Sequence, residues 1–173
     1  VALEQLAHIR HNADVLAVAT VQEEIGLKGA TVSAYDAAPD LAIALDVTFA
    51  EQPLAPKSDT FPLGEGPTIG LGPNFHPKLV QRLRNLAEQW EIPYHIEPLP
   101  GASGTDAWAI QVSRDGVPTA LLSIPVRYMH QPVETLDTQD VTRTGRLLAA
   151  FITELRADFL DELAWSENLE KGK

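Results

Sequence analysis

Two adjacent glutamates, Glu23 and Glu24, directly follow an apolar, β-branched run in the stretch AVATVQEEIGLKGA (17–30). Such a pair is most often a solvated surface pair, because a chain that leaves the core exposes its next residues to water. Carboxylates at this point could also hold a cation or take a proton from a reacting group. This stretch alone leaves both interpretations open.

Two other residues occupy similar positions further along the chain. Asp46 closes the apolar run DLAIALDV (40–47), and His130 follows the run PTALLSIPV (118–126). Each residue alone is explained as well by a turn at a strand end or by a histidine with structural partners. Together, carboxylates and an imidazole at three such ends suit a divalent transition ion such as zinc, cobalt or manganese.

The elements that would position these residues alternate between two kinds. Apolar runs predict buried strands, and amphipathic patterns between them predict helices. The strands are expected at 14–21, 40–47, 66–72 and 118–126, and the helices at 76–90, near 103–112 and at 138–163. This alternation predicts an α/β fold with a mixed, mostly parallel sheet covered by helices. Ligands bind beyond the carboxyl ends of such strands, so we expect Glu23, Asp46 and His130 at one edge of the sheet.

Less regular stretches complete the prediction. The polar, Pro-rich stretch 49–67 is expected to be a long loop. His76 is expected at the start of a helix, and His95 is expected in an edge strand. Asp106 fits the cap of a short helix, a role open also to Ser103 and Thr105, and its turn could face the site.

Composition excludes several classes of function. The 173 residues suffice for one domain, and 13 Lys and Arg against 24 Asp and Glu give a net charge of -11, which disfavours nucleic acid as a partner. With no cysteine, disulfides, thiolate metal sites and cysteine nucleophiles are excluded. No apolar run approaches the roughly 20 residues that span a bilayer, and we expect a cytoplasmic protein without a membrane partner.

Four motifs in order, TVQEEIGLKGA, ALDVT, SGTDA and IPVRYMHQPVE, resemble the glutamyl aminopeptidase and tetrahedral aminopeptidase family. Its members are two-metal peptidases, some of which carry names such as cellulase or endoglucanase. The resemblance covers residues 1 to about 155. It implies a zinc-peptidase-like (phosphorylase/hydrolase-like) catalytic domain, a peptide substrate and two divalent metal ions, zinc or cobalt. It also implies homo-oligomers, with twelve-subunit tetrahedra among the family members.

The resemblance carries over residue by residue. Glu23 matches the general base, and Glu24 matches a terminal ligand of one metal, shared with His130. Asp46 matches a ligand of the second metal. Further candidates for substrate binding are Thr105, Asp106 and Arg127.

Two parts of the family pattern have no counterpart in this sequence: the His of an early H-x-D motif and an Asp that bridges the metals. We therefore expect residues 1–173 to be the C-terminal part of a metallopeptidase catalytic domain, inactive alone, with the upstream portion and a small inserted β domain absent. One alternative is an endoglucanase-type glycoside hydrolase, whose two carboxylates must flank a sugar at roughly 5–9 Å separation. The other is a non-catalytic subunit of the same fold.

Overall fold

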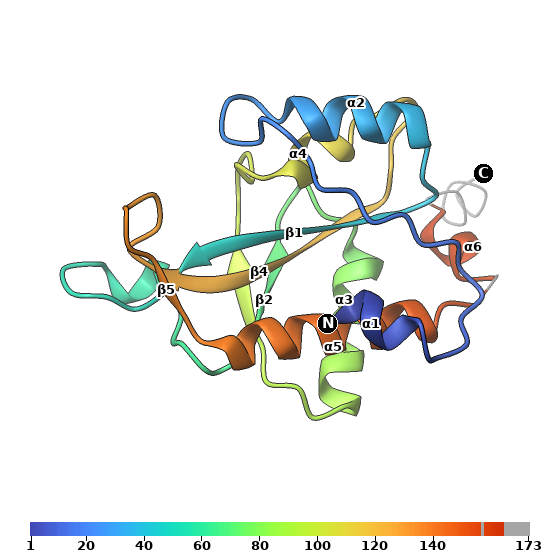
Figure 1. The fold of residues 1–173 in the computed structure, drawn as a ribbon. Helices are drawn as coiled ribbons and strands as arrows, with labels where there is room; N and C mark the ends of the chain where they lie inside the picture. Colours follow the sequence, from blue (N-terminus) through green and yellow to red (C-terminus); the bar gives the residue numbers. More distant parts are fainter. Residues whose placement is uncertain (157, 165–173) are drawn as a thin grey trace, which may run out of the picture.

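A mixed sheet lies between two layers of helices (Figure 1). The computed structural model describes residues 1–156 and 158–164. The sheet has the strand order β1-β4-β2-β3, and β5 pairs with β4. β1–β4 and β2–β3 are parallel, whereas β2–β4 and β4–β5 are antiparallel, which confirms the predicted α/β class. The strands are β1 (Ala42–Phe49), β2 (Thr68–Leu71), β3 (His95–Pro98), β4 (Thr119–Arg127) and β5 (Thr135–Leu136).

Helices cover both faces of this sheet (Figure 1). One layer contains α2 (Lys28–Ala37) and α4 (Asp106–Ile110), which contact each other. The other contains α1 (Ala2–Leu6), α3 (Pro77–Gln89), α5 (Thr138–Thr153) and α6 (Phe159–Leu163). Among the described residues, no helix is long and apolar enough to cross a membrane.

Helix α3 follows from its sequence. Pro77 occupies the first turn, where a missing N–H costs nothing, and His76 precedes it in an extended conformation. The predicted apolar stripe is buried at Leu79, Val80, Leu83, Leu86 and Ala87. The same prediction was wrong for Trp90, which is the C-cap beyond the last helical residue and is 50% exposed. Its indole Nε1 donates to Glu154 Oε1 at 3.1 Å.

The strand predicted at 14–21 was wrong. Residues 14–20 run beside the sheet without forming a backbone hydrogen bond to any residue that the structure describes. Its apolar side chains, including Leu16 at 69% exposure, lie open to solvent. An apolar, β-branched pattern indicates a chain that fits a sheet, but a strand also needs a neighbour to complete its ladder.

The single helix predicted at 138–163 was also wrong, because two helices, α5 and α6, replace it. Phe151 and Phe159 pack edge to face with their ring centroids 6.2 Å apart. A straight helix would separate these two positions by about 12 Å along its axis. The break after Thr153 therefore lets α6 fold back and bury Phe159 and Leu163 in the core.

Helix α2 lies where the sequence analysis predicted neither a helix nor a strand. Gly29, Thr31, Val32 and Ser33 are poor helix formers, and no side chain caps its start. Its buried residues are the small Ala30 and Ala34, which allow close packing in a layer where α2 contacts α4. The segment 50–67 is the predicted long loop, with one short 3₁₀ turn at Lys57–Asp59.

Candidate active site

Glu23 and Glu24 lie in the tight turn that joins the extended segment 14–20 to α2. The Glu23 carbonyl oxygen accepts hydrogen bonds from the backbone N–H groups of Gly26, at 3.1 Å, and Leu27, at 3.0 Å. The preceding residue, Gln22, has φ of 59°. Left-handed backbone at a non-glycine residue is costly, and it persists where the surrounding structure holds it.

His130, in the turn after β4, approaches the turn that carries Glu24. Its Nε2 lies 3.2 Å from Glu24 Oε1, and both side chains are mostly exposed. The turn after β4 also uses left-handed backbone, at Tyr128 with φ of 61° and at His130 with φ of 62°. In this turn the Tyr128 N–H donates to the Gln52 side chain, and the His130 N–H donates to the Glu134 side chain, each at 2.7 Å. These two bonds hold the backbone of the turn that carries His130.

Asp46 lies within β1, in register with Ser123 of β4. The strand continues to Phe49, so Asp46 does not end it, contrary to the prediction. Its Oδ1 accepts the N–H of Val47 at 2.7 Å. Burial raises the pKa of Asp46, the Val47 N–H opposes this, and the charges of Asp106, Glu24 and Glu97 add to the rise.

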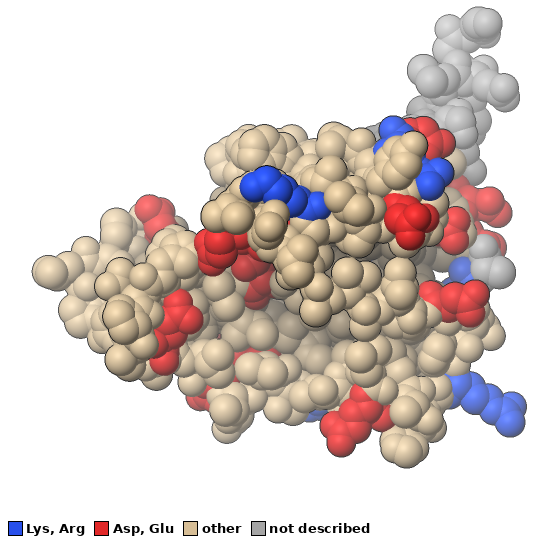
Figure 2. Space-filling model, turned by 45° about the horizontal axis from the view of Figure 1, so that its top comes forward, with Lys and Arg blue, Asp and Glu red and all other residues tan. Residues whose placement is uncertain are grey.

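The pKa of Glu23 is also raised, first by burial and then by the charges of Asp46, Glu24 and Asp106, with His130 acting in the opposite direction. These interactions show that the predicted carboxylates and the imidazole face a common region. Figure 2 shows acidic side chains gathered in the recess between the α2 layer and the lobe formed by the loops at that end of the sheet. A carboxylate with a raised pKa suits proton transfer nearer neutral pH.

The donor set fits divalent cations in part. Neighbouring carboxylate charges raise the pKa of Glu23 and of Asp46, and a cation placed between such carboxylates stabilises them. Asp106 adds a buried oxygen, Oδ1, for which the described residues provide no hydrogen-bond partner. Across residues 1–156 and 158–164, however, no group of three or more His, Asp and Glu side chains is arranged to hold an ion. The Glu24–His130 pair and Asp46 stay candidates for part of a coordination shell.

The three other candidates have different surroundings. Thr105 is buried at the N-cap of α4, and its hydroxyl lies 3.0 Å from Ser103 Oγ. Asp106 accepts a hydrogen bond from Thr20. The Arg127 Nε donates to the Glu51 carbonyl at 2.6 Å and so joins the ends of β4 and β1. Their role in substrate binding stays a prediction.

Sequence reasoning missed three residues that hold the site: Thr20, Gln52 and Glu134. Each acts through a hydrogen bond to a residue of the site or of its turns. Glu134 is four residues from His130, so its local spacing was an available signal. Thr20 and Gln52 lie 86 and 76 positions from their partners and leave no pattern in the sequence.

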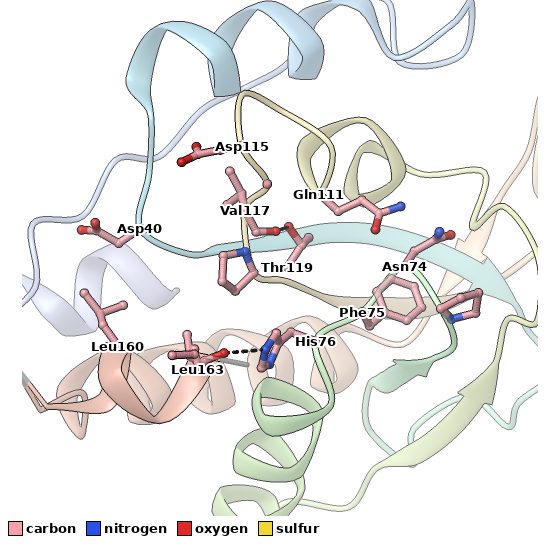
Figure 3. A pocket seen from close by; sticks show the side chains of 14 residues that line it. Asp40, Asn74, Phe75, His76, Gln111, Asp115, Val117, Thr119, Leu160 and Leu163 are labelled. Carbon is pink, nitrogen blue, oxygen red and sulfur yellow. Dashed lines mark hydrogen bonds between the residues drawn. The ribbon is translucent and has the colours of Figure 1, made fainter. Parts of the chain in front are cut away.

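A separate pocket of about 470 Å³ lies at the amino ends of β1 and β4, opposite the candidate site (Figure 3). His76 lies in its wall, as the predicted helix-start residue, and its Nε2 donates to the Leu163 carbonyl of α6 at 3.0 Å. Burial lowers the pKa of His76, the bond to Leu163 opposes this, and Lys78 lowers it further. The neutral imidazole thus joins α3 to α6.

We expect acidification to weaken this junction. Because the folded pKa of His76 lies below its ordinary value of 6.5, the unfolded chain binds the proton more readily. Its contribution to stability is complete above 6.5 and is lost as the pH falls below it. Urea unfolding midpoints at about pH 7.5 and about pH 5.5 test this against His76→Asn. Equal pH dependence in both chains contradicts the expectation.

The fold and the side chains define an α/β domain whose candidate ligand site lies toward the carboxyl ends of its parallel strands. Residues 1–147 match the M42 glutamyl aminopeptidase family. The chain belongs to this family.

Individual relatives agree with this assignment. A lysyl aminopeptidase from Pyrococcus furiosus is 49% identical over 146 residues, covering 84% of this chain and 42% of that protein. An aminopeptidase structure from the archaeon Desulfurococcus kamchatkensis superposes with a TM-score of 0.82 at 40% identity, covering 94% of this chain and 47% of that one. The Pyrococcus horikoshii TET1 peptidase gives a TM-score of 0.64 at 36% identity, covering 79% and 40%. The chain thus spans less than half the length of the curated relatives it matches.

Proposed function

We propose that this chain carries the general base and part of the metal shell of an aminopeptidase that removes N-terminal residues from peptides. The observation that carries the proposal is the convergence of Glu23, Asp46 and the Glu24–His130 pair in a member of the M42 family. Three segments far apart in the sequence supply these groups, and each is held by its own backbone or side-chain bonds.

In this mechanism Glu23 takes a proton from the attacking water and returns it to the leaving amine. Its raised pKa favours both halves of this transfer. When bound, two divalent ions, zinc or cobalt, would supply the Lewis acid that polarises the carbonyl and activates the water. Glu24 and His130 would hold one ion, and Asp46 would hold the other.

The active enzyme, in this proposal, includes an upstream portion that completes the ligand set, and we call it the complete enzyme below. The length of the relatives supports this, as does the partial donor set of the described residues. The TET1 peptidase of Pyrococcus horikoshii can assemble into a tetrahedron or a large octahedral shell, and we propose a homo-oligomer here as well. The cytoplasmic location stays a prediction.

A substrate comparison tests the reaction class. The complete enzyme is offered leucyl and glutamyl p-nitroanilides and, separately, carboxymethylcellulose, with and without a chelator. We expect release of p-nitroaniline that the chelator abolishes, and no cleavage of the polysaccharide. Cleavage of the polysaccharide without peptidase activity would establish the glycoside hydrolase alternative instead.

His130→Ala and Asp46→Asn should act through metal affinity. Each change removes a donor from a different ion, so we expect at least about a tenfold loss of affinity and partial rescue of activity by added metal. Metal content is measured by mass spectrometry on the purified complete enzyme. His95→Ala is the matched control, because His95 lies on β3 beside Glu65. Full occupancy of both sites in either test variant rules out the ligand assignment.

A further inference from the structure

The segment that leads to Glu23 has few ties to the rest of the molecule. Within the described part of the chain, residues 14–20 make no backbone hydrogen bonds. Val15, Leu16 and Val18 are exposed, so apolar burial also holds this stretch weakly. A catalytic base that follows such a loosely held segment needs an anchoring contact, because a small displacement of a reacting group removes much of its contribution to the reaction rate.

Thr20 supplies that anchoring contact. Its hydroxyl donates to Asp106 Oδ2 at 2.6 Å, across 86 residues of sequence. Asp106 is the first residue of α4, a helix that packs on β1 and β4. The bond therefore joins the segment 14–20, through α4, to the sheet that carries Asp46.

The bonds that follow connect the turn to α2. The Val21 carbonyl accepts the N–H of Gly29 at 2.9 Å, and the Gln22 carbonyl accepts that of Lys28 at 3.4 Å. A Cβ at position 29 would lie 2.4 Å from the Val21 nitrogen, so glycine is needed for this close approach. The turn is thus attached to α2 after Thr20 and to α4 through Thr20.

Asp106 has surroundings that a simple cap residue does not need. No side-chain cap bond is formed at the start of α4, where Thr105 is the N-cap. The Oδ1 atom of Asp106 is buried without a hydrogen-bond partner among the described residues, and such groups call for an explanation. The Asp106 charge also raises the pKa of both Glu23 and Asp46, so it lies near both groups.

We propose that Thr20 and Asp106 form a positioning pair that fixes Glu23 relative to Asp46, an inference that rests on the proposed role of Glu23 as the base. Neither residue needs to touch the substrate for this. The hydroxyl of residue 20 is the critical group, so Thr20→Val removes the bond and keeps the shape of the side chain. Thr20→Ser keeps the hydroxyl.

Hydrogen exchange on the 173-residue chain tests the positioning directly. The amides of residues 26–29 donate to the carbonyls of residues 21–23 and report on the order of the turn. We expect Thr20→Val to raise their exchange about tenfold, and Thr20→Ser to restore it. Amides of α5 should be unchanged, which excludes global destabilisation. Thr31→Val is the matched control, because among the described residues its hydroxyl bonds only to the carbonyl of Leu27, the N-cap of its own helix.

Kinetics of the complete enzyme provide the second readout. We expect Thr20→Val to lower kcat about tenfold with little change in KM, because the base is misplaced while substrate contacts remain. If amide exchange at residues 26–29 is the same in Thr20→Val as in the Thr31→Val control, the proposal that Thr20 and Asp106 position the turn is overturned. A normal kcat despite faster exchange overturns its catalytic role. A complete enzyme inactive in its wild-type form overturns the proposed function and, with it, that role, while the exchange result still decides whether the pair orders the turn.

Discussion

Glu23→Gln in the complete enzyme should lower kcat by about 10²–10⁴-fold, the usual contribution of a general base. Glutamine has nearly the same shape but cannot take the proton from the attacking water. Glu23 is half-buried and faces Asp46, Glu24 and Asp106, whose charges together with its burial raise its pKa. Removing its charge also relieves this repulsion, so the fold and the metal content should be retained.

Steady-state kinetics and metal analysis of the same preparation check this expectation. Glu88→Gln is the matched control, because Glu88 is exposed on α3 and accepts a hydrogen bond from the Tyr94 hydroxyl. The control should keep normal turnover. Near-normal turnover of Glu23→Gln removes Glu23 from the mechanism, and loss of metal from this variant would reassign it as a ligand.

Asp140→Ala should lower the free energy of unfolding by about 3–5 kcal/mol, the usual effect of removing one partner of a buried ion pair. Asp140 is fully buried on α5. Its two oxygens accept the backbone N–H groups of Gly64 and Gly66, each at 2.7 Å. Arg143 lies 3.5 Å away and donates to the Gly64 carbonyl as well. Alanine leaves all these donors without the carboxylate, while the loop that leads into β2 loses its attachment.

Urea unfolding of the 173-residue chain measures this loss. Asp137→Ala at the start of the same helix is the control, because Asp137 is a partly exposed N-cap whose Oδ1 accepts only the Gln139 N–H among the described residues. Its loss should cost about 1 kcal/mol, typical of a helix cap. If the two substitutions cost the same, the buried carboxylate does not hold the loop.

The strands that could be predicted are those buried within this chain. The runs at 40–47, 66–72 and 118–126 became β1, β2 and β4 within two residues, because β-branched apolar runs bounded by turns identify sheet interiors. The equally apolar run at 14–21 did not, since pairing depends on a neighbour that a local pattern cannot reveal. The break between α5 and α6 could not be predicted for a related reason. It depends on the packing of Phe151 against Phe159, which a local pattern does not reveal.

The candidate site shows the same division. Glu23, Glu24 and His130 could be selected because they follow apolar runs, and Asp46 because it closes one. The residues that orient them could not, since the Thr20–Asp106 and Gln52–Tyr128 bonds join distant positions. Residue type and position at a strand end are thus enough to predict the reactive side chains. The residues that orient them can be identified only from the three-dimensional structure.

This chain, we propose, supplies the base and a partial metal shell, which the upstream portion completes. Peptidase activity of the 173-residue chain alone, measured beside that of the complete enzyme, tests this division of the active site. With added zinc or cobalt, we expect hydrolysis of leucyl or glutamyl p-nitroanilide by the complete enzyme and none by the isolated chain. A metal site needs enough donors to fix its geometry, and here the described residues form no group of three. Hydrolysis by the isolated chain would contradict the proposal that its active site is incomplete.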